Sequence, residues 1–347
     1  MNADGHLLEV DDLTVHFPIT RGVVVRRSIG TVHAVDGVSL TLDARETLGL
    51  VGESGSGKTT LGRAIVGLYR PTSGSIRLDG RELTDEARRA ERGRLQMVFQ
   101  DPVASLDPRW TVRASVEEPL RLNGVGDARE RRARVLELLE VVGLPGRFAT
   151  RYPHELSGGQ RQRVGVARAL ALRPSIVVAD EAVSALDVSV QAQILNLLER
   201  LQREFGIAYL FIAHDLGVVE HISDRVAVMY LGRIVELAPT ASVFRDPLHP
   251  YTVSLLSAIP VPDPAVESTR ERIVLRGDPP NPASPPSGCR FHTRCWLRDS
   301  LGGPEVCETD EPSLRPLGSG HVVACHFAEN LRGSAEQRQA IGAEARA

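Results

Sequence analysis

Lysine is almost absent from this chain of 347 residues, although basic residues are plentiful. Lys58 is the only lysine, and every other basic side chain apart from histidine is an arginine. Aromatic residues make up only 4% of the chain, and no apolar run approaches the roughly 20 residues that cross a bilayer. The net charge of −3, with arginines spread along the chain, gives no electrostatic reason to expect nucleic acid as a partner.

Cysteine is confined to one segment, which holds Cys289, Cys295, Cys307 and Cys325. The first residues, Met1–Asp4, do not resemble a signal peptide, so we expect the protein to stay in the cytoplasm. In that reducing compartment, clustered cysteines favour metal ligation over disulfides. Hydrophobic residues make up 42% of the chain, enough for one large core with an appendage.

The sole lysine lies in the segment Gly52-Glu53-Ser54-Gly55-Ser56-Gly57-Lys58-Thr59-Thr60, between the apolar run Leu48–Val51 and a stretch of helical pattern. Its glycines let several backbone N–H groups face one point, and the following helix adds its positive N-terminal end. The segment therefore predicts a phosphate-binding loop, in which the lysine reaches the outer phosphates and Thr59 is placed to hold Mg²⁺. A compact ammonium suits this position better than a bulkier guanidinium.

Short apolar runs that alternate with helical segments predict an α/β fold with a parallel sheet covered on both faces. We expect an edge strand over Leu7–Phe17 and then a loop or hairpin over Pro18–Gly30, interpreted as a solvated excursion that carries Arg21, Arg26 and Arg27. Further strands are predicted at Val38–Leu42, Thr47–Val51, Ser75–Leu78, Leu95–Phe99, Ile176–Ala179, Ala208–Ala213 and Val226–Tyr230.

Between about residues 101 and 173 the pattern changes to helices with proline and glycine breaks. Helices are predicted over Val112–Leu122 and Ala128–Val142, with a third that begins near Ser157, so we interpret this region as a helical insertion. The α/β pattern ends near residue 245. Prolines are dense through Pro260–Pro286, and the polar tail of residues 328–347 is predicted to have no fixed structure.

Two carboxylates follow the buried strand that begins at Ile176. Asp180 would bind the Mg²⁺ shell, and Glu181 would accept a proton from, or orient, the water that attacks the γ-phosphate in line. The alternative is a strand terminus without function, which the phosphate loop upstream disfavours.

The segment Leu156–Gln160 opens a helix with Ser157 as its N-cap and two glycines that leave backbone N–H groups uncovered. One nucleotide cannot use two anion-binding helix ends far apart in the same subunit. We therefore interpret this end as serving a nucleotide held by a partner subunit, and a glycine-rich cap without function is the alternative.

These motifs, in this order, resemble the ATP-binding subunit of ABC transporters, over roughly residues 7–245. The resemblance rests on Gly52–Thr60, Gln100, Leu156–Gln160, Val177–Glu181, Ser184-Ala185-Leu186-Asp187 and His214. It implies the P-loop NTPase fold with an ABC-type ATPase core in residues 1–245. One departure is Ala182, where the family usually has proline, and we expect a modest loss of rigidity there without loss of activity.

The resemblance also implies roles for individual residues. The residues expected to bind ATP are Phe17, Gly52, Ser54, Gly55, Ser56, Gly57, Lys58, Thr59 and Thr60, although Phe17 could instead be a core phenylalanine. Those expected to complete the partner's ATP site are Ser157, Gly158, Gly159, Gln160 and Asp187. The expected catalytic residues are Glu181, His214 and Gln100, and the expected Mg²⁺ ligands are Thr59, Gln100 and Asp180.

The rest of the chain, about residues 246–327, is similar to the C-terminal extension of ATP-binding subunits of oligopeptide, dipeptide and nickel importers. The matching segments are Pro247–Thr252, Leu275–Pro280 and Gly288–Phe291. Asp101–Arg109 is similar to the stretch where the transmembrane partner docks in this family. Phe17–Ile19 with the basic segment after it resembles the second of the two ATPases that these importers often carry.

The four cysteines are separated by five, eleven and seventeen residues, which is not the paired spacing of a zinc ribbon. Four thiolates can hold zinc or an iron–sulfur cluster, and some relatives with this extension carry a [4Fe–4S] cluster at such cysteines. The sequence leaves three states open: a [4Fe–4S] cluster at Cys289, Cys295, Cys307 and Cys325, a zinc ion, or free thiols. His292 or His326 could replace one ligand.

The resemblance implies an ATPase at the cytoplasmic face of the membrane that uses ATP and Mg²⁺ to power peptide import. It would pair head to tail with a second, different ATPase chain, act on two transmembrane permeases, and depend indirectly on an extracytoplasmic solute-binding protein. A nickel importer is an alternative. A soluble ABC ATPase of DNA repair or translation is a second alternative, but such proteins usually have long coiled coils or two ATPase units, and this sequence has neither. A regulatory module that no longer hydrolyses ATP is a third, but it would have lost Glu181, Gln100 or His214, and all three are present.

Overall fold

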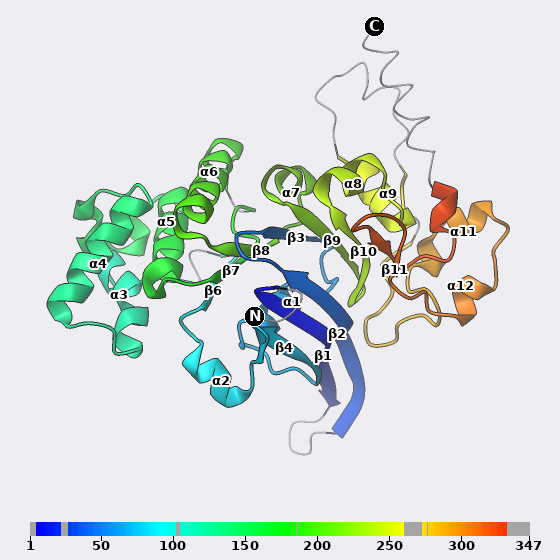
Figure 1. Ribbon diagram of the computed structural model, residues 1–347, viewed down its shortest axis with the longest axis horizontal. Helices are drawn as coiled ribbons and strands as arrows, with labels where there is room; N and C mark the ends of the chain where they lie inside the picture. The colour runs from blue at the N-terminus through cyan, green and yellow to red at the C-terminus, as the bar shows by residue number, and fades with distance from the viewer. Residues whose placement is uncertain are drawn as a thin grey trace, which may run out of the picture.

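The computed structural model describes residues 5–21, 27–101, 105–184, 186–259, 273–275 and 277–331. Several residues named above lie outside these ranges: Arg26, Pro102–Ala104, Ala185, residues 260–272, Arg276 and the tail from residue 332. Figure 1 shows an elongated molecule with an α/β centre, a helical end that contains α3 and α4, and an opposite end that contains α11 and α12.

Eight strands of the described chain form one sheet in the order β11-β12-β10-β9-β3-β8-β7-β6. Its parallel part comprises β3 (Thr47–Val51), β6 (Leu95–Val98), β7 (Ile176–Asp180), β8 (Ala208–Ile212) and β9 (Arg225–Tyr230). β10 (Arg233–Pro239) pairs antiparallel with β9. The predicted parallel strands lie within one residue of the observed bounds, because strands buried on both faces are continuous apolar runs.

Two hydrophobic cores lie on the two faces of this sheet. On β8, Tyr209 and Phe211 belong to one core, whereas Leu210 and Ile212 belong to the other. α1 (Lys58–Ile65) packs between this sheet and a second, smaller sheet. The opposite face is covered by α6 (Val188–Phe205), α7 (Leu216–Ile222) and α8 (Thr240–Arg245).

The second sheet is antiparallel, in the order β2-β1-β4-β5. Its strands are β1 (Leu8–Arg21), β2 (Arg27–Leu42), β4 (Ser73–Leu78) and β5 (Arg81–Glu82). β1 is therefore not the predicted edge strand, since it pairs with both β2 and β4. Of the loop or hairpin expected over Pro18–Gly30, the described residues show the hairpin, because β1 and β2 pair as far as Arg21 and Arg27. Pro18 is tolerated because pairing with β4 ends at Thr14, which leaves that side of β1 open.

The helical end contains α3 (Val112–Leu122), α4 (Ala128–Val141) and α5 (Gly158–Ala169). Polar caps fix where each helix begins. Thr111 accepts a hydrogen bond from the backbone of Ala114, and Asp127 forms a reciprocal capping box with Glu130. The observed bounds differ from the predicted ones by at most one residue for α3 and α4, because such caps are readable from sequence.

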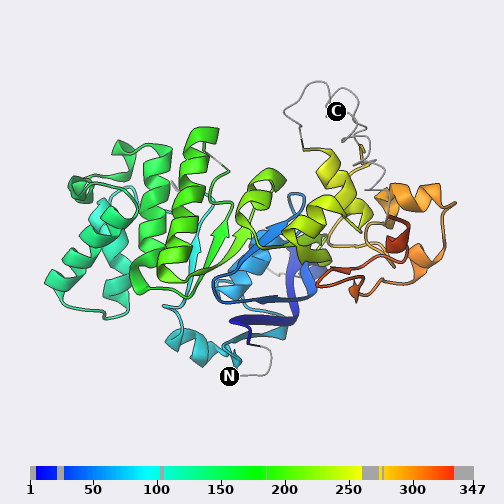
Figure 2. The ribbon, with the colours of Figure 1, turned by 45° about the horizontal axis from the view of Figure 1, so that its top comes forward.

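The C-terminal part contains α9 (Pro250–Ser257), α11 (Trp296–Ser300), α12 (Val306–Thr309), β11 (Arg315–Pro316) and β12 (Val322–Val323). β12 pairs with β10, so this part extends the large sheet rather than forming a separate one. The predicted boundary at residue 245 stays a prediction. Remaining short elements are α2 (Asp85–Ala90), η1 (Gly146–Thr150), η2 (Pro153–Glu155), η3 (Leu170–Leu172), η4 (His292–Arg294) and η5 (Ala328–Leu331). Figure 2 shows the C-terminal elements, coloured orange to red, gathered at the end of the molecule opposite α3 and α4.

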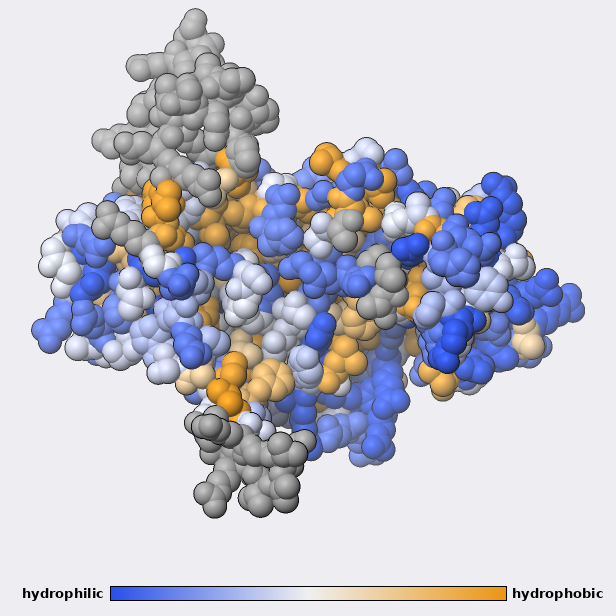
Figure 3. All heavy atoms as spheres, turned by 180° about the vertical axis from the view of Figure 1, so that it is seen from behind, coloured by the Kyte–Doolittle hydropathy of each residue, from blue (hydrophilic) through white to orange (hydrophobic). Residues whose placement is uncertain are grey.

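Figure 3 shows one face on which polar residues dominate and apolar residues occur in scattered groups. No helix within the described ranges has both the length and the apolar character needed to span a bilayer.

Candidate active site

The phosphate loop joins the end of β3 to the start of α1. Two glycines are required by its geometry: Gly52 has a φ of 151° and Gly57 a φ of 107°. A Cβ atom at either position would lie 2.1 Å from a backbone oxygen, that of Met229 for Gly52 and that of Ala34 for Gly57. Only glycine fits, because the obstacle is backbone that cannot move aside.

Lys58 is 5% exposed and folds back over its own loop. Its Nζ donates to the carbonyl oxygens of Gly52 and Glu53, each at 2.8 Å, and to Ser56 Oγ at 3.3 Å. Burial lowers the pKa of the ammonium group, and the nearby carboxylates of Glu181, Asp180 and Glu53 oppose that shift. The cation is thus held inside the loop, where an anion would replace the carbonyl oxygens as its partner.

Asp180 lies at the end of β7, directly beside the start of α1. Thr59 Oγ1 donates to Asp180 Oδ1 at 2.8 Å, and the other carboxylate oxygen, Oδ2, is buried without a hydrogen-bond partner. Burial raises the pKa of this carboxyl group, since a charge there lacks solvent. A hydroxyl, a carboxylate and an unsatisfied buried oxygen at one point are the oxygen ligands that Mg²⁺ takes, so these residues fit the ion.

Glu181 connects two other predicted residues. Its Oε2 accepts a hydrogen bond from Gln100 Nε2 at 2.6 Å and lies 3.5 Å from Nδ1 of His214. Glu181 has a positive φ of 45°, a strained conformation for a residue other than glycine. Ala182 after it is 2% exposed, so it lies inside the protein. The structure brings Gln100, Glu181 and His214 together at the carboxyl end of the sheet, beside Asp180.

The segment Leu156–Gln160 lies at the start of α5, away from this group. Ser157 Oγ accepts from the backbone of Gln160, and the Gln160 side chain accepts from the backbone of Ser157, which closes a capping box. Ser157 and Gly158 are exposed, whereas Gly159 packs against Val190. No hydrogen bond among the described residues joins this helix end to the phosphate loop.

Asp187 and Phe17 complete the predicted set. Asp187 caps α6: its Oδ1 accepts from the backbone of Val190 at 2.9 Å and from Ser189 Oγ at 2.7 Å, which lowers its pKa. Phe17 lies on β1, partly buried, with its ring 5.2 Å from that of Tyr69 in an edge-on arrangement. The two rings meet edge to face, so Tyr69 does not stack on Phe17.

The four cysteines line one small cavity together with His249, Phe291 and His326. No disulfide joins any two of them. Burial raises the pKa of Cys289 to about 12, of Cys295 to about 11 and of Cys325 to about 12, and it raises that of Cys307 as well. The predicted cluster residues therefore do converge in space.

Sequence reasoning missed one feature of the site, the contact between Glu53 of the phosphate loop and Arg294 near the cysteines. No local signal could have found it, because 241 residues separate the two positions.

Comparison with known proteins now decides the family. Residues 35–184 match the family model described as ABC transporter, and residues 235–300 match the one described as oligopeptide/dipeptide transporter, C-terminal region. The chain is 51% identical to the oligopeptide transport ATP-binding protein AppF of Bacillus subtilis (strain 168), over 92% of this chain and 97% of that protein. It is 50% identical to the oligopeptide transport ATP-binding protein OppF of Escherichia coli (strain K12), over 92% and 95%.

The chain belongs to the ATP-binding subunits of ABC transporters. Among solved structures, the ATP-binding cassette MJ0796, in a dimeric post-hydrolysis state bound to ADP and Pi, superimposes with a TM-score of 0.59 at 31% identity, over 67% of this chain and 98% of that chain. The predicted α/β ABC ATPase core and the ATPase activity are thus confirmed, with ATP and Mg²⁺ as the cofactors of the family.

Proposed function

We propose that this chain hydrolyses ATP to power the import of peptides across the cytoplasmic membrane, from its cytoplasmic face. The relatives AppF and OppF are named as oligopeptide transport proteins, and the extension matches a model named for oligopeptide and dipeptide transporters. One observation carries the proposal. The sheet that holds Glu181, whose carboxylate accepts a hydrogen bond from Gln100, also pairs through β10 with β12 of the C-terminal extension.

In the proposed mechanism, the loop from Gly52 to Thr60 binds the phosphates of ATP and Lys58 turns from its own carbonyl oxygens to the outer phosphates. Thr59, Asp180 and Gln100 would hold Mg²⁺, which neutralises phosphate charge when bound. Glu181 takes the proton of the attacking water or orients that water. The hydrogen bond from Gln100 and the nearby ring of His214 fix where its carboxylate points.

A second subunit would complete each nucleotide site. Ser157 and Gly158 are exposed at the start of α5, so this helix end is accessible to the γ-phosphate on a partner chain. The solved relative MJ0796 is dimeric with ADP and Pi bound, which supports this arrangement. Asp187, at the start of α6, would communicate between the two sites. We infer that the partner ATPase is a different chain.

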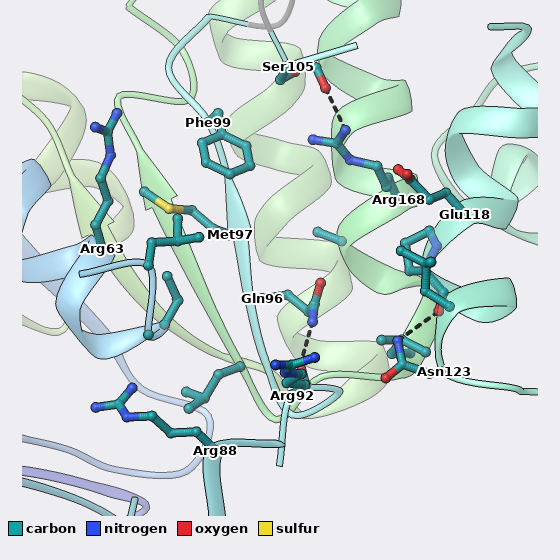
Figure 4. Close-up of a pocket in the computed structure, with 18 of the residues that line it drawn as sticks. Arg63, Arg88, Arg92, Gln96, Met97, Phe99, Ser105, Glu118, Asn123 and Arg168 are labelled. Atoms are coloured by element: carbon teal, nitrogen blue, oxygen red, sulfur yellow. Dashed lines mark hydrogen bonds between the residues drawn. The ribbon is translucent and has the colours of Figure 1, made fainter. Parts of the chain in front are cut away.

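The transmembrane permeases would dock in the cavity between the helical end and the sheet, which has a volume of about 850 Å³. Figure 4 shows Met97 and Phe99 on one wall, with Arg168 and Glu118 on the other. Arg168 donates to the carbonyl oxygen of Ser105 at 2.5 Å, which ties the two walls together. Gln100 also lines this cavity, so one residue touches both the proposed docking cavity and Glu181.

Transport assays test the proposed function. A strain that lacks this chain should regain ATP-dependent uptake of a radiolabelled tripeptide when it expresses the wild-type chain, but not when it expresses Lys58→Ala. Radioactive nickel uptake should not change.

The purified complex should contain two permeases and a second ATPase. Restored nickel uptake without peptide uptake would contradict the proposed substrate, and recovery with ribosomes or DNA would contradict the transport role.

We also propose that the four cysteines hold a [4Fe–4S] cluster. A single tetrahedral zinc ion would bring its four sulfur atoms to roughly 3.8 Å from one another. Among the described residues, no three of the cysteine sulfur atoms lie within 4.8 Å of one another, which is wider than a single zinc ion requires. A four-iron cluster, which four cysteine thiolates hold, is larger than one zinc ion and keeps its four sulfur ligands farther apart. Its formation would deprotonate thiols that burial otherwise keeps neutral.

Iron and acid-labile sulfide assays on anaerobically purified protein test this assignment. Wild-type protein should be coloured and contain both, and Cys289→Ser should lose both while Ser300→Ala, on α11 outside the cavity, should keep them. A colourless preparation that contains one zinc would replace the cluster by a zinc site, and a preparation without metal would leave free thiols.

A further inference from the structure

The phosphate loop is held from outside the ATPase core by an arginine of the C-terminal extension. Arg294 Nη1 donates to Glu53 Oε2 at 2.9 Å, and Nη2 donates to Glu53 Oε1 at 3.3 Å, so the pair is bidentate. The side chain of Arg294 is only 6% exposed and that of Glu53 is 28% exposed. A bidentate, largely desolvated pair holds its partners in one geometry better than an exposed ion pair does.

The backbone of the same loop residue is fixed by a second residue from beyond position 245. The Glu53 N–H donates to the hydroxyl oxygen of Tyr251 at 2.7 Å. Tyr251 is fully buried, and its ring packs 4.7 Å from that of Tyr230 and 5.4 Å from that of Phe291. Both the backbone and the side chain of Glu53 therefore take their position from the C-terminal extension.

The charge of Glu53 makes this contact matter for anion binding. A carboxylate within a loop that binds phosphates repels them unless a cation compensates it. Arg294 supplies that cation, because a guanidinium stays charged in proteins and two of its nitrogen atoms donate to the Glu53 carboxylate. Lys58 cannot serve both roles, because it must bind the phosphates themselves.

We propose that Arg294 is a positioning residue of the nucleotide site: it neutralises Glu53 and fixes the start of the phosphate loop, so that the C-terminal extension sets the ATP affinity of this subunit. This inference rests on the proposed role of the loop in binding ATP. It requires no metal at the cysteines. Arg294 directly precedes Cys295, however, so any shift of the cysteine segment acts on the phosphate loop through this pair.

Four variants of the full-length chain test the inference: Arg294→Ala, Arg294→Lys, Glu53→Gln and the double variant Arg294→Ala/Glu53→Gln. Arg315→Ala is the matched control, since Arg315 makes an equally bidentate pair with Glu329 inside the extension, away from the loop. The readouts are the dissociation constant of a fluorescent ATP analogue, the KM and kcat for ATP of the assembled transporter, and the melting temperature.

We expect Arg294→Ala to weaken nucleotide binding and raise KM about tenfold, with kcat within twofold of the wild type. Arg294→Lys should lose less, because it keeps the charge. Glu53→Gln should bind nucleotide within threefold of the wild type, and the double variant should recover most of the affinity lost in Arg294→Ala, since the uncompensated carboxylate is then gone. Arg315→Ala should not change affinity.

Two results would overturn the inference. One is an Arg294→Ala chain that binds nucleotide within twofold of the wild type. The other is a loss of affinity that Glu53→Gln does not relieve, which would mean that Arg294 only stabilises the extension. If Arg294→Ala fails to fold, Arg294→Lys carries the test: a single ammonium cannot make the bidentate pair, so KM should rise about threefold, and an unchanged KM would overturn the inference. A wild-type chain that binds no ATP would instead contradict the proposed function, so the two failures are distinguishable.

Discussion

Glu181 is the residue on which the proposed hydrolysis depends, and its surroundings favour a base rather than a structural role. Its carboxylate accepts from Gln100 and lies beside His214, while its backbone is strained at a positive φ. Strain of this kind persists only where neighbouring contacts hold it, and here the Glu181 N–H donates to the carbonyl oxygen of Ile212 at 2.9 Å.

Replacing Glu181 by glutamine should remove turnover while ATP still binds. Glutamine keeps the size and one hydrogen-bond acceptor but cannot take a proton, so we expect the rate of phosphate release to fall by at least about a hundredfold, the usual scale of general base catalysis. Phosphate release and binding of a fluorescent ATP analogue measure the two properties. Glu199→Gln, on α6 and paired with His221, is the control. Hydrolysis that survives in Glu181→Gln would show that the base is elsewhere.

His249 should make stability depend on pH in a defined window. It is 1% exposed, its Nδ1 accepts from the backbone of Tyr251, and burial lowers its pKa from 6.5 to about 3. At a pH between about 3 and 6.5, His249 binds a proton in the unfolded chain but not in the folded chain. The free energy of unfolding therefore falls as pH drops below 6.5, by up to about 1.4 kcal/mol per pH unit from this group.

Urea unfolding at pH 7, 6 and 5 checks the prediction for His249. His249→Asn keeps an acceptor for the Tyr251 N–H but does not titrate, so its stability should vary less over this range. His221→Asn is the control, because the side chain of His221 is 59% exposed. Equal pH dependence in the wild type and His249→Asn would assign the effect to other groups.

At the scale of elements, the start of α5 depends on a close approach to α6. A Cβ atom on Gly159 would lie 2.4 Å from Cγ1 of Val190, a short branched side chain that cannot swing away. On the same helix, a Cβ on Gly165 would meet nothing within 4 Å. A larger side chain therefore fits at Gly165 but not at Gly159.

Alanine substitutions at these two positions should have opposite effects. We expect Gly159→Ala to lower the free energy of unfolding by about 1–3 kcal/mol, as overpacking does. Gly165→Ala should raise it by about 0.5–1 kcal/mol, since alanine is the better helix former. Urea unfolding monitored by circular dichroism measures both. A stabilising effect of Gly159→Ala would show that α5 and α6 separate easily.

At the scale of the whole molecule, we propose that each chain carries two half-sites that face different nucleotides. In this proposal the loop at the centre binds this chain's ATP, and the exposed end of α5 serves the partner's. Communication would then pass from the proposed docking cavity through Gln100 to Glu181, and from the extension through Arg294 to the loop. The helical end and the extension lie on opposite sides of the nucleotide loop (Figure 1).

Substituting Ser157 by arginine should separate binding from turnover. A large cation at the exposed helix end would block the partner's γ-phosphate, so hydrolysis by the assembled transporter should fall at least about tenfold, while this chain still binds ATP at its own loop. Photolabelling of this chain with an azido-ATP and phosphate release by the complex are the measurements. Thr111→Ala is the control, since it removes another helix cap, worth about 1 kcal/mol, without touching a nucleotide. Loss of this chain's own labelling would contradict the separation of the two half-sites.

Much of the fold was readable because its signals are local. β3, β7 and β8 are fully buried and largely apolar, and α3 begins at a readable cap. Past Phe17 the hairpin of β1 and β2 was only one of two alternatives, because proline and a basic stretch hide pairing that depends on the opposite strand. β12 was missed as well, since two residues become a strand only by pairing with β10.

The sequence by itself determined the phosphate loop, since contiguous glycines and one lysine carry their own backbone geometry. It also determined that Asp180 would meet Thr59, since strands of a parallel sheet end at the same edge, and the 2.8 Å bond between them follows. Only the tertiary structure decided that Arg294 holds Glu53 and that four distant cysteines share one cavity. Contacts across 241 residues depend on how the extension packs against the core, which no local pattern records.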